Sequence, residues 1–379
     1  DLKTNTTYYF RIKPVDRLLR PTQFSNIAST QTVARFPDNF GFDINITSVV
    51  FNWTSVNGLN ENGSSGYIIA IYSENDILIS SQVINDPGTN SFTITDLSTN
   101  TSYMVTFSVL NSAGVENSQF FYLTTLSPPP ENFKLIYLSS TVATLGWDKV
   151  DLSSGYILLA STSPFFEPEL IISSETDDIS ISTLTILNLL PNTTYYFKAA
   201  SLNSDGVPNY SNNITTVTLS VPIDPSKITL LPSPTSITAI YEKLEVSTHP
   251  YGTKGYIFEV STLPFTTGTV YSSSTNTNEI NSLTITNLKP NTLYYARIAT
   301  INQANNPNYS QIISTQTPVP YLDLKPKVIS YSSTTITVSY STAIVDGYIL
   351  EVSTEEVFLQ IFASTQTTNP QISTLTVSS

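Results

Sequence analysis

Apolar residues occupy alternate positions through the stretch Asn188 to Asn203, which reads NLLPNTTYYFKAASLN. A period of two is that of a β-strand with one buried face, and the Pro-Asn pair before it predicts a turn that leads into the strand. The phrase recurs in four copies, and its first tyrosine is at Tyr8, Tyr103, Tyr195 and Tyr294. The steps between these tyrosines are 95, 92 and 99 residues, the size of a whole small domain.

Further alternating stretches lie at similar places in each period. Val49, Phe51 and Trp53 alternate on an early strand. The position of this tryptophan carries an aromatic residue again in later periods: Trp147, Tyr241 and Tyr340. A Gly-Tyr pair then opens an apolar run, and a stretch such as SFTITDL leads into the tyrosine strand. This pattern of about seven short strands with turns between them is typical of a two-sheet β-sandwich.

Short proline-bearing stretches (SPPP, VPIDPS and TPVP) mark the boundaries between periods and predict stiff joints rather than flexible linkers. They divide the chain into three complete modules, 34–125, 126–218 and 219–317, and two partial ones. Residues 1–33 hold the last two strands of a module, the tyrosine strand and a second near Asn26 to Thr32. Residues 318–379 hold the front of a module that stops before its tyrosine strand.

The two partial modules complement each other. Leu375 to Ser379 matches Leu184 to Asn188, so residue 379 lies where a tyrosine strand is about to begin in the other modules. We expect the sequence to be part of a longer or processed precursor. Two interpretations stay open. Residues 1–33 of one copy insert as the missing strands of module 318–379 in another copy, or both ends are limits within a longer covalent array.

Composition narrows the classes of partner. The chain has 379 residues and a net charge of −13, with 29 acidic and 16 basic side chains. This acidic balance disfavours nucleic acid and anionic membrane surfaces as partners, because both carry negative charge. The absence of cysteine excludes disulfides, zinc–thiolate sites and cysteine nucleophiles. No apolar run reaches about 18 residues, so we expect no membrane span.

The phrase L-x-P-x-T-x-Y resembles the fibronectin type III domain, and so does a tryptophan on an earlier strand followed by a Gly-Tyr-led strand. The resemblance covers all three complete modules and both partial ones. It implies an all-β fold of tandem seven-strand Greek-key sandwiches of immunoglobulin-like type, with a tyrosine corner near the start of the sixth strand. The corner tyrosines would be Tyr8, Tyr103, Tyr195 and Tyr294. Thr4 and Thr99 replace the proline of the phrase. The Ser-, Thr- and Asn-rich composition looks like that of bacterial surface arrays and implies an extracellular or cell-surface location.

The candidate residues have structural rather than catalytic character. Trp53, Trp147, Tyr241 and Tyr340 are in phase with apolar neighbours and are expected in the cores. The second tyrosines of the phrase, Tyr9, Tyr196 and Tyr295, point to the opposite face and are candidates for contact with a partner. Sequons in the turns make Asn5, Asn100 and Asn192 candidate glycosylation sites, with a glycan as a candidate partner.

Catalytic chemistry finds no support in the sequence. The single histidine, His249, lies in a loop beside Pro250 and has no acid or nucleophile at useful spacing. The acidic cluster of Glu175, Asp177 and Asp178 lacks the D-x-D-x-D-G spacing of a calcium loop, and we interpret it as a solvated turn. We therefore expect no enzyme activity, no metal site and no cofactor.

Three functions agree with these features. The first is a non-catalytic extracellular structural protein, a rod of sandwiches that forms a surface filament or sheath through head-to-tail pairing with further copies. The second is an adhesin or a carbohydrate- or protein-binding array that uses long loops or the outer tyrosines. The third is the spacer region of a secreted polysaccharide-degrading enzyme.

Overall fold

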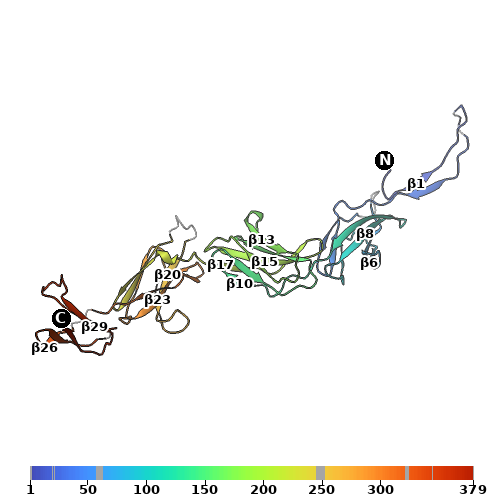
Figure 1. Cartoon of the computed structure of the whole chain (residues 1–379). Coiled ribbons are helices and arrows are strands. Elements are labelled where there is room, and N and C mark those ends of the chain that lie inside the picture. Colours follow the sequence, from blue (N-terminus) through green and yellow to red (C-terminus); the bar gives the residue numbers. More distant parts are fainter. Residues whose placement is uncertain are drawn as a thin grey trace. The chain divides into compact units, whose positions relative to one another are not determined.

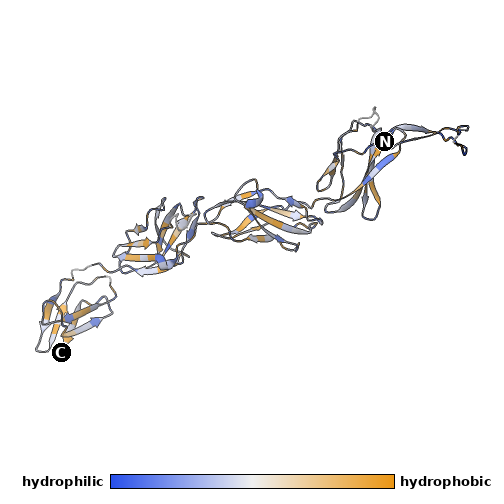
Figure 2. Ribbon diagram, turned by 90° about the horizontal axis from the view of Figure 1, so that it is seen from above, coloured by the Kyte–Doolittle hydropathy of each residue, from blue (hydrophilic) through white to orange (hydrophobic). Residues whose placement is uncertain are grey.

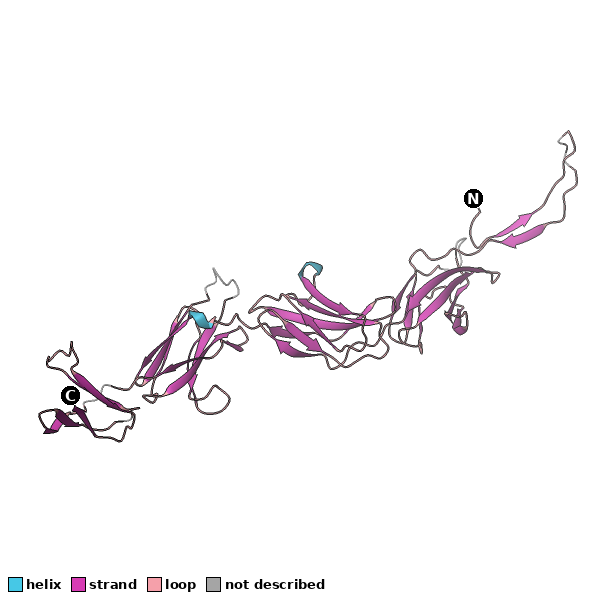
Figure 3. Cartoon of the chain, viewed as in Figure 1, coloured by secondary structure: helices cyan, strands magenta, loops and turns pink. Residues whose placement is uncertain are grey.

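The computed structural model describes residues 2–18, 20, 22–56, 63–244, 252–320, 324–343 and 345–378. The chain is all-β and built of antiparallel sheets, and these described residues contain two 3-10 helices, Pro168–Leu170 and Pro225–Lys227 (Figures 1 and 3). Contacts group it into two compact units: Asp1–Tyr137 with Val142–Leu187 and Tyr195–Thr215, and Leu138–Thr141 with Asn188–Thr194 and Thr216–Ser379. In the described part of the chain, no helix has the length and apolarity needed to cross a membrane.

The first unit begins with a two-stranded hairpin. Strand β1 (Thr7–Phe10) pairs antiparallel with β2 (Ala28–Gln31), and Tyr8 lies opposite Thr30. These are the two strands expected from the sequence, although β1 is shorter than its counterparts in the complete modules. Regular pairing ends at Phe10, and Pro14 lacks the N–H group that a ladder hydrogen bond would need at its position.

Module 34–125 is a sandwich of two sheets. One sheet has the order β3-β4-β7, from Gly41–Ile44, Val49–Asn52 and Ser91–Ile94. The other has the order β6-β5-β8-β9, from Leu78–Ile84, Gly66–Ser73, Ser102–Leu110 and Glu116–Thr124. Their facing side chains, including Phe51, Ile69 and Phe107, are fully buried. The hydrophobic residues of the strands are orange in Figure 2. The predicted alternation is therefore confirmed, with seven strands in two sheets.

Modules 126–218 and 219–317 repeat this architecture. Their first sheets have the orders β10-β11-β14 (Lys134–Leu138, Ala143–Gly146, Thr183–Ile186) and β18-β19-β22 (Ile228–Ser233, Ser236–Tyr241, Ser282–Ile285). Their second sheets have the orders β13-β12-β15-β16 (Ile171–Thr176, Gly155–Ser161, Thr194–Leu202, Pro208–Tyr210) and β21-β20-β23-β24 (Val270–Thr275, Gly255–Ser261, Leu293–Ile301, Pro307–Tyr309). Strands β17 (Ile214–Val217) and β25 (Ile313–Gln316) also pair with the tyrosine strands β15 and β23.

The sequence predicts the last strand of module 126–218 near Asn213 to Leu219, and β17 lies there. A further short strand, β16, precedes it, with a break between the two. The break follows from Ser211, whose Oγ accepts the N–H of Ala199 at 3.1 Å in place of a backbone carbonyl. Ser310 does the same for the N–H of Ile298 in module 219–317. A side-chain oxygen that replaces a ladder acceptor interrupts the pairing.

Residues 324–378 form an open half of the same sandwich. One sheet has the order β26-β27-β30, from Lys327–Tyr331, Thr335–Ser339 and Thr374–Ser378, and the other pairs β28 (Tyr348–Val352) with β29 (Ala363–Thr367). In each complete module the strand at the position of β28 has the tyrosine strand on its second edge. Within the described residues, the second edge of β28 has no strand partner.

Candidate functional site: the joints between modules

The corner tyrosines fasten the turn at the start of their strands. Tyr103 is buried, and its hydroxyl accepts the N–H of Ser98 at 2.9 Å. Tyr294 accepts the N–H of Lys289 at 3.0 Å, and Tyr8 that of Lys3 at 2.6 Å. Tyr195 is equally buried at the same place in its module. Each of these tyrosines thus fixes the turn whose asparagine contacts the next module.

The aromatic residues of the early strands all pack on the tyrosine of the Gly-Tyr pair in the same module. The ring pairs are Trp53–Tyr67, Trp147–Tyr156, Tyr241–Tyr256 and Tyr340–Tyr348, with centroids 5.1, 5.3, 4.7 and 4.6 Å apart. Trp53, Trp147 and Tyr241 are buried, and burial raises the pKa of the Tyr241 hydroxyl. These placements give the residues a packing role.

Sequence reasoning did not assign a role to the tyrosine of the Gly-Tyr pair. The hydroxyl of Tyr256 accepts the N–H of Leu244 at 2.8 Å, and that of Tyr67 accepts the N–H of Val56 at 2.9 Å. The glycine before it is required by close approach, because a Cβ at Gly255 would overlap the carbonyl oxygen of Thr275. The recurring Gly-Tyr pair was the available signal.

The asparagine that ends three of the four tyrosine phrases lies at the joint with the preceding module. In Asn203 the Nδ2 donates to the carbonyl oxygens of Thr124 and Thr125, at 3.1 and 3.3 Å. Its Oδ1 accepts the N–H groups of Asp205 and Val207, at 3.1 and 2.8 Å, within its own turn. We call this residue the docking asparagine. Its single amide fastens both the turn of its own module and the end of the preceding module's last strand.

The same arrangement recurs in two further joints. Asn111 donates to the carbonyl oxygen of Thr32 at 3.0 Å, and Asn302 donates to those of Val217 and Thr218, both at 3.0 Å. Their Oδ1 atoms accept N–H groups of their own turns, from Ala113, Val115 and Asn306. All three docking asparagines are at most 1 % exposed. Because a buried amide without partners is costly, the loss of these contacts would destabilise each joint.

The turn before each tyrosine strand supplies a second contact. Asn100 has φ of +44°, a left-handed conformation that asparagine adopts more readily than most residues. Its Oδ1 accepts the N–H of Ser204, the residue after the docking asparagine, at 2.7 Å. The corresponding pairs in the other joints are Asn5 with Ser112, at 3.0 Å, and Asn192 with Gln303, at 2.7 Å. The sequence-predicted glycosylation residues therefore lie in the joints, and all three are half-buried.

Glycosylation at these residues stays a prediction. It would involve side-chain amides that also make contacts in the joints. The Nδ2 of Asn5 donates to the carbonyl oxygen of Gly63 at 2.8 Å, and that of Asn100 donates to Ser154 Oγ at 3.3 Å. A glycan is attached at this same nitrogen. Attachment would therefore compete with the contact that each amide makes across its joint.

A third asparagine reaches the connection between modules. Asn209 donates from Nδ2 to the carbonyl oxygen of Ser127 at 2.8 Å. The equivalent bonds are from Asn117 to Ala34, at 2.9 Å, and from Asn308 to Ser220, at 2.7 Å. Each of these three joints thus contains two asparagine side chains that bind backbone groups of the adjoining module, and a third that binds a backbone carbonyl at the start of its own module, next to the joint. Sequence reasoning missed the docking and third asparagines, although each recurs at a similar place after the corner tyrosine.

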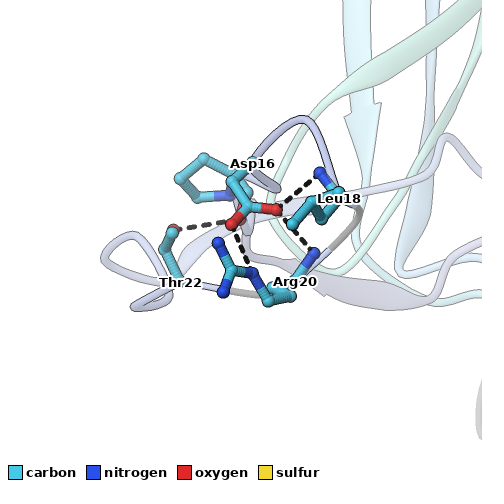
Figure 4. A network of polar contacts seen from close by, with 5 residues as sticks. Asp16, Leu18, Arg20 and Thr22 are labelled. Atoms are coloured by element: carbon cyan, nitrogen blue, oxygen red, sulfur yellow. Dashed lines mark hydrogen bonds and ion pairs between the residues drawn. The ribbon is translucent and has the colours of Figure 1, made fainter.

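Segment 2–33 departs from this pattern at Asp16, which stands where the complete modules carry the docking asparagine. Its Oδ1 accepts the N–H groups of Leu18 and Arg20, both at 2.9 Å, and Oδ2 accepts Arg20 Nε at 2.7 Å (Figure 4). The hydrogen bond from the Arg20 backbone lowers the pKa of the Asp16 carboxyl below its ordinary value. The turn is preserved, but a carboxylate has no N–H to donate to a neighbouring carbonyl.

The joint before segment 324–378 is partly formed. Asn291 has φ of +47°, as in the other turns, and its Nδ2 donates to Asp346 Oδ1 at 3.2 Å. Its Oδ1 accepts Gln316 Nε2 at 2.9 Å. In the complete joints, the Oδ1 of the equivalent asparagine accepts a backbone N–H from the turn that follows the tyrosine strand of the next module.

Chemistry-bearing clusters are sparse. In the described ranges, no group of three or more His, Asp or Glu side chains is arranged to hold a metal ion. Glu175, Asp177 and Asp178 are exposed. Asp178 accepts the N–H of Ser180 at 2.9 Å in the turn, whereas Glu175 lies on strand β13 and not in the predicted turn. His249 and the central parts of the two long loops, 57–62 and 245–251, lie outside the described residues.

Comparison with known proteins supports the same fold. Residues 36–121 match the family model of the fibronectin type III domain. The Kelch domain-containing protein SSO1033 of Saccharolobus solfataricus is 28 % identical over 192 residues, a match that covers 51 % of this chain and 24 % of that protein. The aligned part is therefore a minor portion of the relative.

Two solved structures to which this chain is similar contain tandem fibronectin domains. The FN1–FN3 domains of chicken CNTN1 are 18 % identical with a TM-score of 0.28, over 74 % of this chain and 98 % of that chain. A two-domain fibronectin type III segment of chicken tenascin is 17 % identical with a TM-score of 0.29, over 50 % and 98 %. The module architecture rests on the strand order and on the family match.

Proposed function

We propose that the chain is a non-catalytic extracellular structural protein, an array of sandwiches held in a defined relation by its joints. The docking asparagine carries this proposal, because in three joints it recurs buried and hydrogen-bonded to the preceding module. Domains joined by a short linker ordinarily move relative to one another. Two asparagine side chains that bind backbone groups across each joint oppose that motion.

The experiment is a measurement of coupled motion. We expect ¹⁵N relaxation to give the modules on both sides of Asn203 one common rotational correlation time. Asn203→Ala should separate the correlation times of modules 34–125 and 126–218. The matched control is Asn213→Ala, since Asn213 is exposed. Independent tumbling of these modules in the parent chain would contradict the structural proposal.

Location is tested on intact cells that produce the protein. An antibody against module 126–218 should label such cells before permeabilisation, and protease added outside should remove the signal. Labelling that requires permeabilised cells would contradict the extracellular assignment.

The partner in this proposal is a second copy of the chain, paired head to tail into a filament or sheath. Its segment 2–33 supplies the tyrosine strand and last strand that segment 324–378 lacks. Phe10 and Ile12 support this, because they are 47 % and 74 % exposed whereas the equivalent Phe197 and Ile298 are fully buried. An open strand edge with a free hydrophobic face favours strand addition.

Association is measured by sedimentation velocity over a range of protein concentrations. We expect species that grow in steps of one chain, since head-to-tail pairing does not close. A chain that stays monomeric at every concentration would contradict pairing between copies and would favour completion by neighbouring modules of a longer polypeptide.

A second candidate function is adhesion through module 34–125. Phe120 and Tyr122 on β9 are 64 % and 78 % exposed, and β6 carries exposed Leu78 and Ile79. Exposed aromatic residues are common anchors in protein interfaces. A binding screen with the parent chain and the Phe120→Ser, Tyr122→Ser variant tests this function, and equal retention on every ligand would reject it.

A further inference from the structure

The guanidinium of Arg297 in module 219–317 is surrounded by side chains from two other strands and a loop. Arg297 on β23 has its guanidinium 4.0 Å from the ring centroid of Phe265 and 3.7 Å from that of Tyr309. Glu259 lies directly opposite on β20, and its Oε2 is 2.7 Å from Arg297 Nη2 and 2.8 Å from Nε. We call this group of two rings, one cation and one opposite residue the clamp.

Module 126–218 has the same clamp with different residues. The Nζ of Lys198 lies 4.1 Å from the ring centroid of Phe166 and 4.0 Å from that of Tyr210. The opposite residue on β12 is Leu159, so this clamp has no acid. Phe166 and Phe265 share a left-handed backbone, with φ of +54° and +57°, which points to one loop design. Module 34–125 has Thr106 at the position of the cation and lacks the clamp.

Segment 2–33 carries half of a clamp. The guanidinium of Arg11 lies 3.6 Å from the ring centroid of Phe24. Arg11 is three residues after the corner Tyr8, as Arg297 is three residues after Tyr294. Ser25, the residue after Phe24, accepts the N–H of Ile12 at 2.9 Å, just as Ser310 after Tyr309 accepts that of Ile298. Arg11 has no carboxylate partner in the described part of the chain.

Segment 324–378 carries the other half. Glu351 on β28 is three residues after Tyr348, as Glu259 is three residues after Tyr256. Phe358 has φ of +51° and lies five residues after Ser353, as Phe166 lies five residues after Ser161. Phe358 is 50 % exposed, whereas Phe166 under its lysine is 8 % exposed. The ring and the acid are thus in place, and the cation is missing from the described residues.

We infer that Arg11 of one copy enters the space between Phe358 and Glu351 of a second copy and completes a clamp there. The inference rests on the proposed head-to-tail pairing and names its recognition residues. Arg11 would lie opposite Glu351 in the ladder, as Arg297 lies opposite Glu259. An arginine that stacks on aromatic rings and pairs with a carboxylate gives both register and specificity. No other tyrosine strand of the chain offers an arginine to this acid except β23, whose arginine is already bound.

The test compares self-association of full-length charge variants by sedimentation velocity. We expect Arg11→Glu and Glu351→Arg each to weaken association at least roughly tenfold, since each leaves two like charges opposed in a partly buried ladder. The double variant, Arg11→Glu with Glu351→Arg, should recover most of the lost affinity. Phe358→Ala should also weaken association. The salt dependence of association should change less in this variant than in the charge variants.

Arg17→Glu is the matched control, because Arg17 is exposed in the same segment and makes the same charge change. If the parent associates but Arg11→Glu associates as tightly as Arg17→Glu, the clamp is rejected and pairing between copies stands. If the double variant is as weak as the single ones, the direct pairing of Arg11 with Glu351 is rejected. A parent that remains monomeric overturns the pairing proposal and the clamp together.

Discussion

Asn203 donates its Nδ2 hydrogen to the carbonyl oxygen of Thr124 across 3.1 Å, although 79 positions separate the two residues in the chain. The Oδ1 of the same amide binds the turn of its own module. Asparagine suits this position because it donates and accepts at once on a short side chain. A joint that depends on both functions should respond differently to the loss of each.

Asn203→Asp keeps an acceptor for the turn and removes the donor. We expect the carboxylate, facing the carbonyls of Thr124 and Thr125, to destabilise the joint by about 3 kcal/mol at neutral pH. Hydrogen exchange by mass spectrometry should show faster exchange in peptides spanning 120–128 and 200–208. Burial would raise the folded pKa of this acid, so the lost protection should return as the pH falls and the protonated acid donates again.

The control for this variant is Asn213→Asp, which adds the same charge at an exposed position. Its exchange pattern should match that of the parent. Equal deprotection by both variants would assign the effect to net charge rather than to the joint.

The corner tyrosines should contribute to stability through one hydrogen bond each. Tyr103→Phe leaves the N–H of Ser98 without its acceptor and should destabilise module 34–125 by about 1 to 2 kcal/mol. Urea unfolding followed by the fluorescence of Trp53, in a Trp147→Phe background, measures this change. Tyr122→Phe, which removes an exposed hydroxyl, should leave the unfolding midpoint within error of the background chain.

Asp16 provides a prediction on pH. Its folded pKa is lowered, so its contribution to the turn is present above the ordinary carboxyl value of 3.8 and is lost as the pH falls through the folded value. The amide signals of Leu18 and Arg20 should therefore shift with a midpoint below 3.8. Asp16→Asn, which restores the residue of the other modules, should keep the turn and abolish this titration. A midpoint at or above the ordinary value would contradict the hydrogen-bonded turn.

Strand register between copies can be trapped covalently, since the chain has no cysteine of its own. Ile157 and Ala200 face each other in module 126–218, and the equivalent positions in the half-modules are Ile349 and Lys13. A Lys13→Cys chain mixed with a tagged Ile349→Cys chain should give a mixed disulfide dimer under mild oxidation. Replacing Ile349→Cys by Ile361→Cys, also exposed, should abolish the mixed species if the register is as proposed.

The sandwich architecture was predictable because its signal is local. Alternation around Tyr195 and the Pro-Asn turn before it depend on neighbours within a few residues, and these fixed strand type, order and buried face. The break between β16 and β17 was not predictable, because it arises when Ser211 uses its side chain in place of a backbone acceptor. Serine at a strand position has no distinctive alternation pattern that announces this choice.

The joints were harder to predict than the cores. Asn203 ends a recurring phrase, and sequence reasoning gave it no role, because its partner Thr124 lies far away in sequence. A contact of that kind leaves no periodic trace in the intervening residues. The recurrence of asparagine eight positions after Tyr103, Tyr195 and Tyr294 was the usable signal, and Asp16 occupies the same position after Tyr8 and accepts the N–H groups of its own turn.

Every docking asparagine binds backbone carbonyls, not side chains, of the module before it. Apart from the turn asparagine, the groups that a module offers to its successor in these bonds are backbone atoms, which do not depend on the identity of its side chains. A gene encoding such an array can gain or lose whole repeats by recombination, and each new neighbour is already compatible, so length can evolve separately from the sequence of any one domain.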